Sequence, residues 1–391
     1  MNILITGAKG FAGKNLVAAL ENIKEGKDRR FPELKIDEIF SFDVDSDISL
    51  LDEYCSKADF VFNLAGVNRP ENTGEFMKGN RDFLSRLLDE LKKSGNTCPV
   101  MLSSSIQATL EGRFKDSDYG KSKKAAEDLL FSYAQQNDVK ALVYRFPNLF
   151  GKWARPNYNS AVATFCYNTA RDLPINVNDE STLLTLCYID DVVEEMICAL
   201  MGKEHRSREN EKFCAVTVEH KVTLGEIVSL LKTFRSFSEN SIMPEIPEGS
   251  FETKLFSTYL SYLPEDKAVI TYKPSADNRG SFTELIKSEK CGQISVNVSL
   301  PGITKGEHWH HSKWEIFIVV HGEARIDMRK VGSEEIISYT VSGDKPQGIY
   351  MLPGYTHRIV NLSDKDKLGT LMWASERFDP ERPDTFFEKV N

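Results

Sequence analysis

Three of the seven histidines in this chain of 391 residues fall within four positions, in the stretch HWHH at residues 308–311. His308 and His310 are two residues apart, so they face the same side if this stretch forms a strand. Glu315 follows shortly afterwards, and His357 lies in a later apolar run. Imidazole and carboxylate groups bind divalent metals, and Zn2+, Fe2+, Ni2+ and Mn2+ all suit this ligand set. The pattern predicts a metal site formed by His308, His310, Glu315 and His357.

A second group of residues suited to chemistry lies near the beginning of the chain. Gly7, Gly10 and Gly13 are spaced by three, between an expected strand and an expected helix. Glycines in this position permit a tight turn and let a pyrophosphate approach the first N–H groups of the helix. The pattern predicts a dinucleotide-binding loop. Asp43 ends the second expected strand, where a carboxylate would bind an adenosine 2′-OH and favour NAD.

Tyr119 and Lys123 are four residues apart on an expected helix, so their side chains share one face. An ammonium beside a phenol lowers the pKa of the phenol, which suits proton transfer to a carbonyl that is being reduced by hydride. Three serines end the preceding strand, and a hydroxyl there can stabilise charge developing on the carbonyl oxygen. Of Ser103, Ser104 and Ser105, we favour Ser105.

The elements that would position these residues change along the chain. From residue 1 to about 150, strand-like runs alternate with amphipathic helical segments, which predicts a doubly wound α/β domain with a parallel sheet. The alternation is less regular from about 151 to 245, as is typical of an appended substrate-binding part. From about 268, short runs with period two predict an antiparallel sandwich or barrel. We expect domains at 1–245 and 268–391, joined by 246–267.

Composition narrows the class of protein. The net charge is −9 and no Lys/Arg-rich block stands out, which argues against nucleic acid or a membrane surface as a partner. The seven cysteines are scattered, without a CxxC pair, and this fits reduced thiols in the cytoplasm. The apolar runs are shorter than the roughly 20 residues that span a bilayer, and we expect neither a signal peptide nor a transmembrane segment.

About the first 240 residues resemble the extended short-chain dehydrogenase/reductase family. The matching motifs, in the family's order, are GAKGFAG from Gly7, NLAG from Asn63, Ser105, the Tyr119/Lys123 pair, RFPNLFG from Arg145 and YIDD from Tyr188. The resemblance implies that Tyr119 is the general acid and that Lys123 binds the nicotinamide ribose. It also implies a substrate site with Arg145 and Asn148, and a cofactor site with Gly7, Gly10, Phe11, Gly13, Asp43, Leu64, Ala65 and Gly66.

The later part of the chain resembles the cupin family, which forms jelly-roll barrels. The spacing Gly302-x5-His308-x-His310-x4-Glu315-x6-Gly322 fits the first cupin motif in full. PGYTHRIVN, residues 353–361, fits the second motif except that proline directly precedes glycine, without the usual intervening residue. This departure bears on the turn geometry more than on the metal. His311 and His321 fall outside the pattern.

A reductase followed by a cupin resembles, nearly end to end, the CapF family of bacterial capsular polysaccharide synthesis enzymes. Further matching stretches include GITKGEHWHH and FDPERPDT. The resemblance implies a homodimer with Zn2+ in the cupin domain and a UDP-4-keto-6-deoxy-N-acetylhexosamine as substrate. The cupin would epimerise C3, and the first domain would reduce the C4 ketone with NADPH. The product implied is a UDP-6-deoxy-L-talosamine derivative on the route to UDP-N-acetyl-L-fucosamine for capsule or O-antigen polysaccharide.

The two reactions suit one substrate, because a C4 ketone acidifies the proton at C3 and is itself the hydride acceptor. A tyrosine or histidine near the metal is the expected type of base, and His311 and Tyr355 are the candidates. NADPH conflicts with the role expected for Asp43; we follow the resemblance and keep NADH as the alternative.

Two other functions stay open. In one, the chain is a monofunctional NAD(P)-dependent nucleotide-sugar reductase whose cupin is a structural, dimerisation or sugar-binding module. In the other, it is a metal-dependent oxygenase, because three histidines and a glutamate also suit Fe2+.

Overall fold

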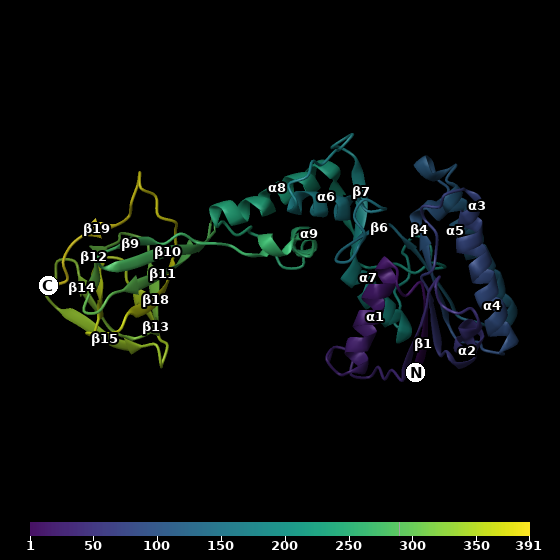
Figure 1. Cartoon of the computed structure of the whole chain (residues 1–391), viewed down its shortest axis with the longest axis horizontal. Helices are drawn as coiled ribbons and strands as arrows, with labels where there is room; N and C mark the ends of the chain where they lie inside the picture. Colours follow the sequence, from purple (N-terminus) through teal and green to yellow (C-terminus); the bar gives the residue numbers. More distant parts are fainter. Residues whose placement is uncertain (289) are drawn as a thin grey trace. The chain divides into compact units, whose positions relative to one another are not determined.

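The structure is a computed structural model that describes residues 1–288 and 290–391 (Figure 1). These residues form two units. The first unit comprises Met1–Leu231 and Glu248–Leu263, and the second comprises Lys232–Pro247 and Pro264–Asn391. This division differs from the expected one, because most of the segment that we expected to connect the domains packs within the first unit. Its helix α9 (Phe251–Leu260) buries an apolar face and contacts α6 (Ala161–Ala170).

A five-stranded parallel sheet, in the order β2-β1-β3-β4-β5, forms the centre of the first unit. Its strands are mostly short buried apolar runs, as expected for a sheet covered on both faces. The strands are β1 (Asn2–Thr6), β2 (Glu38–Phe42), β3 (Phe60–Asn63), β4 (Val100–Ser105) and β5 (Ala141–Phe146). The predicted doubly wound α/β architecture is confirmed.

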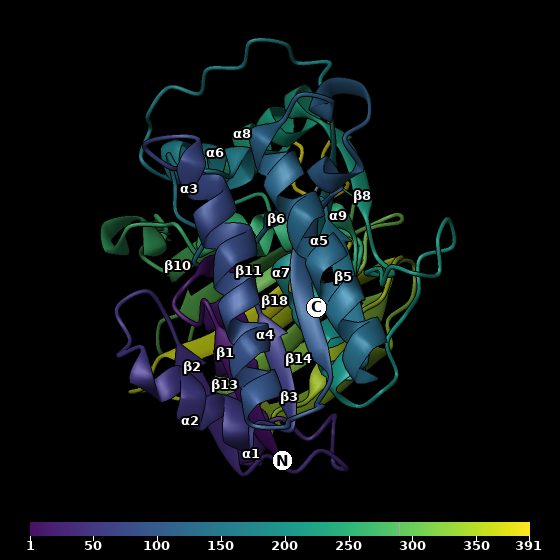
Figure 2. The ribbon, with the colours of Figure 1, turned by 90° about the vertical axis from the view of Figure 1, so that its right-hand side faces the viewer.

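Helices cover both faces of this sheet. In Figure 2 the helices α4 and α5 lie in front of the strands, and Figure 1 shows α1 and α7 on the opposite face. Each face has its own buried hydrophobic cluster. The bounds are α1 (Phe11–Lys24), α2 (Ser49–Lys57), α4 (Phe83–Lys93), α5 (Asp118–Asn137) and α7 (Ile189–Leu200).

The remaining elements of the first unit flank the sheet. Between β3 and β4 the chain forms α3 (Gly74–Met77), a π-helical turn at Lys78–Asp82, and α4. A second sheet has the order β6-β7-β8, with β6 (Asn148–Phe150), β7 (Leu183–Tyr188) and β8 (His220–Thr223). Helix α8 (Leu224–Asn240) begins in the first unit and ends in the second.

The second unit consists of two antiparallel sheets, in the orders β16-β13-β18-β11-β10-β9 and β15-β14-β17-β12-β19. Their inward side chains form one hydrophobic cluster, so the predicted all-β barrel is confirmed. The strands are β9 (Ser275–Asp277), β10 (Gly280–Lys287), β11 (Gln293–Ser299), β12 (Thr304–Trp309), β13 (Glu315–His321), β14 (Glu323–Lys330), β15 (Ile336–Ser342), β16 (Gly348–Met351), β17 (Tyr355–Asn361), β18 (Leu368–Ala374) and β19 (Phe386–Phe387).

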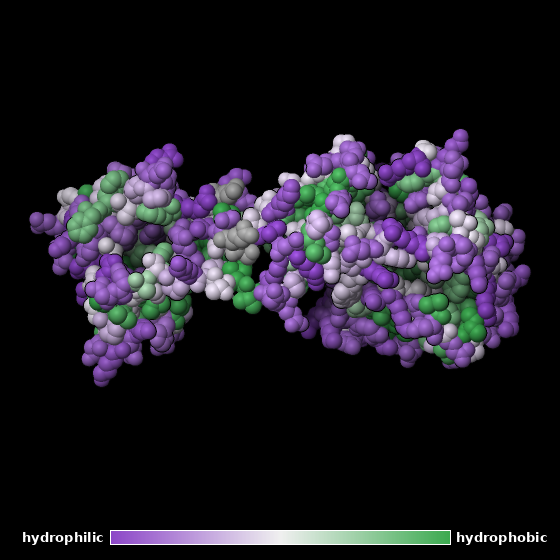
Figure 3. Space-filling view, turned by 45° about the horizontal axis from the view of Figure 1, so that its top comes forward, coloured by the Kyte–Doolittle hydropathy of each residue, from purple (hydrophilic) through white to green (hydrophobic). Residues whose placement is uncertain are grey.

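Hydrophilic residues predominate on the molecular face shown in Figure 3, and hydrophobic residues form smaller patches among them. Within the described residues, no helix combines the length and the apolar character needed to cross a membrane. All seven cysteines carry free thiols.

A buried ion pair joins helix α5 to the central sheet. The carboxylate of Glu127 is 1% exposed and accepts hydrogen bonds from Nε of Arg145 at 2.8 Å and Nη2 at 2.6 Å. The Ser104 hydroxyl donates to the same carboxylate at 2.6 Å. The Arg145 guanidinium also lies 3.9 Å from the centre of the Phe213 ring. Arg145 was expected to bind substrate, but in this structure its charge is neutralised inside the fold.

Replacing Arg145 with methionine leaves a buried carboxylate without its ion-pair partner. We expect Arg145→Met to lower the free energy of unfolding by about 3–5 kcal/mol, measured by urea denaturation. Arg208→Met, at an exposed position, is the matched control and should change it by less than about 0.5 kcal/mol. Unchanged stability in Arg145→Met, together with a raised KM for the sugar substrate, would restore the substrate-binding role.

Candidate active site and metal centre

The first candidate site lies in the first unit, at the carboxyl ends of the parallel strands. The chain leaves β1 and β3 toward opposite faces of the sheet, and such a reversal opens a crevice at the strand ends. A cavity of about 750 Å³ is found here. Among the expected site residues, it is lined by Gly10, Phe11, Leu64, Gly66, Ser105, Tyr119, Lys123 and Asn148.

Gly7 and Gly13 allow close backbone packing beside this cavity. Gly7 has φ +71°, and a Cβ added to it would lie 2.6 Å from the backbone nitrogen of Ala65. A Cβ on Gly13 would lie 2.1 Å from the carbonyl oxygen of Gly7. The loops that follow β1 and β3 therefore touch, and α1 packs directly on the first loop. Gly7, Gly13 and Ala65 act through this packing and do not themselves line the cavity.

Asp43 is also absent from the lining of the cavity. Its carboxylate accepts hydrogen bonds from the backbone N–H groups of Lys9 at 2.7 Å and Val44 at 2.8 Å. It therefore ties the end of β2 to the glycine turn. Lys9 and Lys14 contribute positive charge to the lining.

Tyr119 and Lys123 meet in the cavity as the helical spacing predicts. The Lys123 ammonium lies 5.8 Å from the centre of the Tyr119 ring and donates to the carbonyl of Ser103 at 2.9 Å. Burial raises the pKa of Tyr119 to about 12, and a hydrogen bond with Ser105 opposes this shift. Burial lowers the pKa of Lys123 to about 8, and the charge of Glu127 opposes that shift. In this structure the hydrogen bond with Ser105 favours the phenolate.

Several lining residues of the first cavity were missed by sequence reasoning. Trp153, Arg155 and Tyr158 line it, and the Arg155 guanidinium lies 5.2 Å from the centre of the Tyr158 ring. The mixture of basic and aromatic residues in GKWARPNY was the available signal. Arg113 also lines the cavity, and no sequence pattern marks it.

The second candidate site lies in the second unit, where the four predicted metal ligands come together. His308, His310, Glu315 and His357 each offer one ligand atom, and these atoms lie within 4.8 Å of one another. Nε2 of His310 is 3.6 Å from Oε2 of Glu315, and Nε2 of His357 is 3.8 Å from the same oxygen. These three atoms are buried and lack hydrogen-bond partners among the described residues. A divalent cation would satisfy all three, so the donor set fits a metal.

The protonation states also suit metal binding. Burial lowers the pKa of His308, and it lowers the pKa of His357 to about 3. Burial opposes ionisation of Glu315, but the neighbouring His310 and the charge of Lys313 lower its pKa to about 2. At neutral pH the cluster therefore offers neutral imidazoles at His308 and His357 and an ionised carboxylate at Glu315, which are the forms that bind metals.

A segment near the end of the chain orients this cluster. The Nδ1–H of His310 donates to the carbonyl oxygen of Asp384 at 2.5 Å, which turns Nε2 toward the other ligands. The Asp384 carboxylate accepts hydrogen bonds from three successive backbone N–H groups, those of His311, Ser312 and Lys313, at 2.8–2.9 Å. Sequence reasoning missed Asp384, because it lies more than 70 positions from His310.

The turn that deviates from the cupin pattern lies against the same loop. Gly354 has φ +76°, and its N–H donates to the carbonyl of His310 at 2.8 Å. The glycine thus adopts the left-handed conformation that other residues avoid. Proline directly precedes this glycine, without the residue that usually separates the two, and His357 still lies within the cluster.

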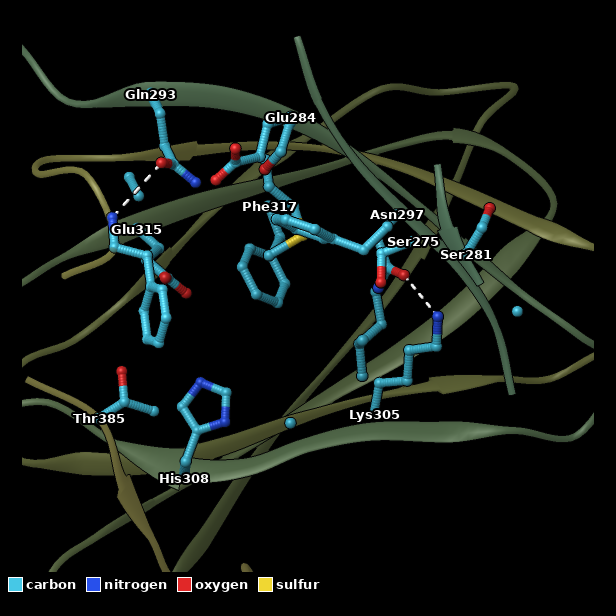
Figure 4. A pocket seen from close by; sticks show the side chains of 18 of the residues that line it. Ser275, Ser281, Glu284, Gln293, Asn297, Lys305, His308, Glu315, Phe317 and Thr385 are labelled. Carbon is cyan, nitrogen blue, oxygen red and sulfur yellow. Dashed lines mark hydrogen bonds between the residues drawn. The ribbon is translucent and has the colours of Figure 1, made fainter. Parts of the chain in front are cut away.

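A cavity of about 500 Å³ opens beside the cluster, and Figure 4 shows His308 and Glu315 facing into it. Polar side chains of β11, including Gln293, Ser295 and Asn297, line its far wall. The two candidate bases, His311 and Tyr355, do not line this cavity. His311 is exposed and its ring packs on Trp309 and Phe386, while Tyr355 packs against the hydrophobic cluster.

Two family models match the chain. The model of the NAD dependent epimerase/dehydratase family matches residues 3–213, and the model of the polysaccharide biosynthesis C-terminal domain matches residues 275–386. A UDP-2-acetamido-2,6-beta-L-arabino-hexul-4-ose reductase of Pseudomonas aeruginosa is 38% identical over 386 residues, which cover 99% of this chain and 98% of the relative.

Solved structures agree with these matches. The crystal structure of CapF from Staphylococcus aureus, described as a capsular polysaccharide assembling protein, is 46% identical, with a TM-score of 0.89 and complete coverage of both chains. UDP-glucuronic acid 4-epimerase from Bacillus cereus, in complex with NAD, shares the fold at 18% identity and a TM-score of 0.51, over 67% of this chain and 96% of its own. The chain belongs to the NAD dependent epimerase/dehydratase family and, over its full length, to the CapF family.

Proposed function

We propose that this chain is a bifunctional nucleotide-sugar enzyme of capsule or O-antigen synthesis. The second unit epimerises C3 of a UDP-4-keto-6-deoxy-N-acetylhexosamine, and the first unit reduces the C4 ketone with NADPH. The product is a UDP-6-deoxy-L-talosamine derivative on the route to UDP-N-acetyl-L-fucosamine. One observation carries the proposal: the chain has two cavities with different chemistry, a proton donor in one and a set of metal ligands in the other. The name of the Pseudomonas relative supports the substrate class.

Reduction takes place in the first cavity, where a bound NADPH supplies the hydride. The raised pKa of Tyr119 keeps its hydroxyl protonated at neutral pH, as donation of a proton to the C4 oxygen requires. Ser105 hydrogen-bonds the same phenol and stabilises the phenolate that remains. Lys123 carries the positive charge of the pair and lies beside Gly66 at the cavity wall.

Epimerisation takes place in the second cavity, where a divalent cation, which we propose is Zn2+, supplies Lewis acidity. His308, His310, Glu315 and His357 would hold it. The inward polar side chains of β11 can hydrogen-bond sugar hydroxyl groups and fix the ring in one orientation. Later reduction of the C4 ketone removes the group that acidifies C3, so it makes the new stereochemistry permanent.

The proposal is tested by incubating the UDP-4-keto sugar with the protein in D2O, without nicotinamide, and following C3 by NMR. We expect deuterium to enter C3. Tyr119→Phe should lower the rate of NADPH oxidation by a factor of about 10²–10⁴ and leave the C3 exchange intact. His308→Ala should lose the metal and the exchange but retain cofactor binding, checked by metal analysis and cofactor titration.

Each result separates the proposal from its alternatives. Absence of exchange in the wild-type protein, with NADPH oxidation intact, would make the second unit a structural or sugar-binding module. Loss of exchange in Tyr119→Phe would contradict two independent sites. Oxygen uptake that depends on iron would indicate an oxygenase.

We also propose that NADPH is preferred over NADH. The oxygens of Asp43 are engaged by two backbone N–H groups, and they do not face the cavity as an acceptor for a 2′-OH would. Lys9, which pairs with Asp45, and Lys14 line the cavity, and their positive charges suit a 2′-phosphate.

We expect kcat/KM for NADPH to exceed that for NADH by roughly tenfold or more. Lys9→Met should reduce this ratio by lowering the value for NADPH alone, whereas Lys35→Met, at an exposed site outside the cavity, should leave it unchanged. A higher kcat/KM for NADH would show that the preference is wrong and would restore NAD as the cofactor.

The outer face of the larger sheet of the second unit supports the proposed homodimer. Along β11, β18, β13 and β16, inward-facing residues alternate with outward-facing residues. Many of the outward-facing residues are apolar, and the strand register places them side by side. They are Ile294, Val296, Val298, Leu371, Trp373, Ile316, Ile318 and Tyr350. A contiguous apolar face of this kind is typical of a protein interface.

A charge at the centre of this face should separate the subunits. We expect the wild-type protein to have twice the mass of one chain in light scattering, and Val296→Glu to shift it toward the mass of one chain. Ile336→Glu, at a 40% exposed position of the other sheet, is the matched control. A wild-type monomer would contradict the homodimer, and a dimeric Val296→Glu would place the interface elsewhere.

A further inference from the structure

Lys305 lines the second cavity but belongs to neither cupin motif. It lies on β12, three residues before His308, and both side chains line the same space. Figure 4 shows them extending from one strand into this cavity. In a regular strand, residues three apart point to opposite faces of the sheet. A local irregularity must therefore place them together.

A β-bulge at Glu307 provides this irregularity. Lys305 pairs with Ile359 and Gly306 with Arg358, and the register then shifts so that His308 pairs with His357. Glu307 is the extra residue and has φ +63°, a left-handed conformation that is strained for a residue with a side chain. Both Lys305 and His308 consequently face the inner side that Ile359 and His357 occupy.

The rest of the fold holds this strained residue in place. The Glu307 carboxylate accepts hydrogen bonds from Arg358 at 3.2 Å and from the backbone N–H of Val390 at 2.7 Å. Its carbonyl oxygen accepts another from the N–H of Glu388 at 3.0 Å. Strained residues are often found at functional sites, where the surrounding structure holds them in place.

The surroundings of Lys305 distinguish it from the other ionisable groups of the cavity. Its Nζ donates to Oδ1 of Asn297 at 2.6 Å and to the carbonyl of Val298 at 3.0 Å, which are both neutral acceptors. Opposite charges nearby, on Asp277 and Arg279, pair with each other at 2.7 Å. Burial lowers the pKa of Lys305; the charge of Asp277 has a smaller effect that raises it, and the charge of Arg279 lowers it further. The fraction of Lys305 present as the free amine near neutral pH is thus larger than for an exposed lysine.

Among the described residues, the remaining ionisable groups that line the cavity are candidate metal ligands, pair with another charge, or are exposed. His308 and Glu315 belong to the ligand cluster, and Lys313 pairs with Glu315 at 3.4 Å. Glu284 pairs with Lys287 at 3.0 Å, and Glu376 is exposed.

We propose that Lys305 is the base that removes the C3 proton in the second cavity, an inference that rests on the proposed epimerase function. The C3–H bond breaks and its proton passes to the free amine of Lys305, which becomes an ammonium. The electron pair of that bond forms a C3–C4 double bond, and the π pair of the carbonyl group moves onto the C4 oxygen, giving the enolate. Water protonates C3 from the opposite face, and the ammonium returns its proton to the hydroxide that results. The sugar leaves inverted at C3 and the enzyme is unchanged.

The test compares C3 deuterium exchange, without nicotinamide, in the wild-type protein, Lys305→Met and the exposed control Lys365→Met, each with its metal content measured. Lys305→Met should lose exchange by roughly 10²–10⁴-fold while keeping its metal. The control should exchange at the wild-type rate. Added methylamine should restore exchange in Lys305→Met in proportion to its free base. The pH profile of the restored rate should follow the pKa of the added amine.

The outcomes separate the two proposals. No exchange in the wild-type protein overturns the epimerase function itself. Wild-type exchange that persists in metal-loaded Lys305→Met overturns the role of Lys305 and leaves the epimerase standing. If Lys305→Met loses its metal, Lys305→Gln, which can still hydrogen-bond to Asn297, takes its place. Failure of amines to restore exchange in a metal-loaded variant also overturns the role of Lys305.

Discussion

A buried nitrogen or oxygen atom without a hydrogen-bond partner costs free energy, and the second unit gathers three such atoms in one place. They belong to His310, Glu315 and His357, which come from three separate parts of two facing sheets. A cation that accepts lone pairs offsets this cost. The surrounding structure serves the same requirement, because the rigid strands fix the ligand positions and hydrogen bonds at Nδ1 fix the ring orientations.

Each unit builds its cavity from its own residues. In the first unit, backbone contacts at Gly7 and Gly13 bring two loops and a helix to the strand ends, and Tyr119 is presented from α5. In the second unit, side chains on strands create the chemistry. On the proposed function, the ketone is the shared element, since the second unit uses its acidifying effect and the first unit consumes it. The chemical order of the two steps then follows from the substrate.

The sequence predicted what depends on local spacing. The four-residue interval between Tyr119 and Lys123, the glycine spacing and the two alternating histidines all relate residues that are close in sequence, and the structure brings each set together. Apart from the approach of His357 to the other ligands, which the cupin resemblance predicted, contacts between distant segments were out of reach. The pairing of Arg145 with Glu127 depends on how α5 packs on β5, and the approach of Asp384 to His310 depends on the path of a segment more than 70 residues later.

Local spacing also fails where a strand is irregular. Period two assigns Lys305 to the face opposite His308, and a single left-handed residue, Glu307, reverses that assignment. The pKa of Tyr119 also depends on more than spacing, since the sequence does not show the burial that raises it.

The hydrogen bonds of Asp384 also bear on the order in which the candidate metal centre forms during translation. All four ligands lie between positions 308 and 357, so they leave the ribosome before Asp384 does. Until Asp384 has been synthesised, the Nδ1–H of His310 and three N–H groups of the adjacent loop lack their acceptors. A nascent chain that ends before this residue carries every ligand yet holds one of them without its final orientation. The ligand cluster therefore reaches its final hydrogen-bonded arrangement only after Asp384 has been synthesised.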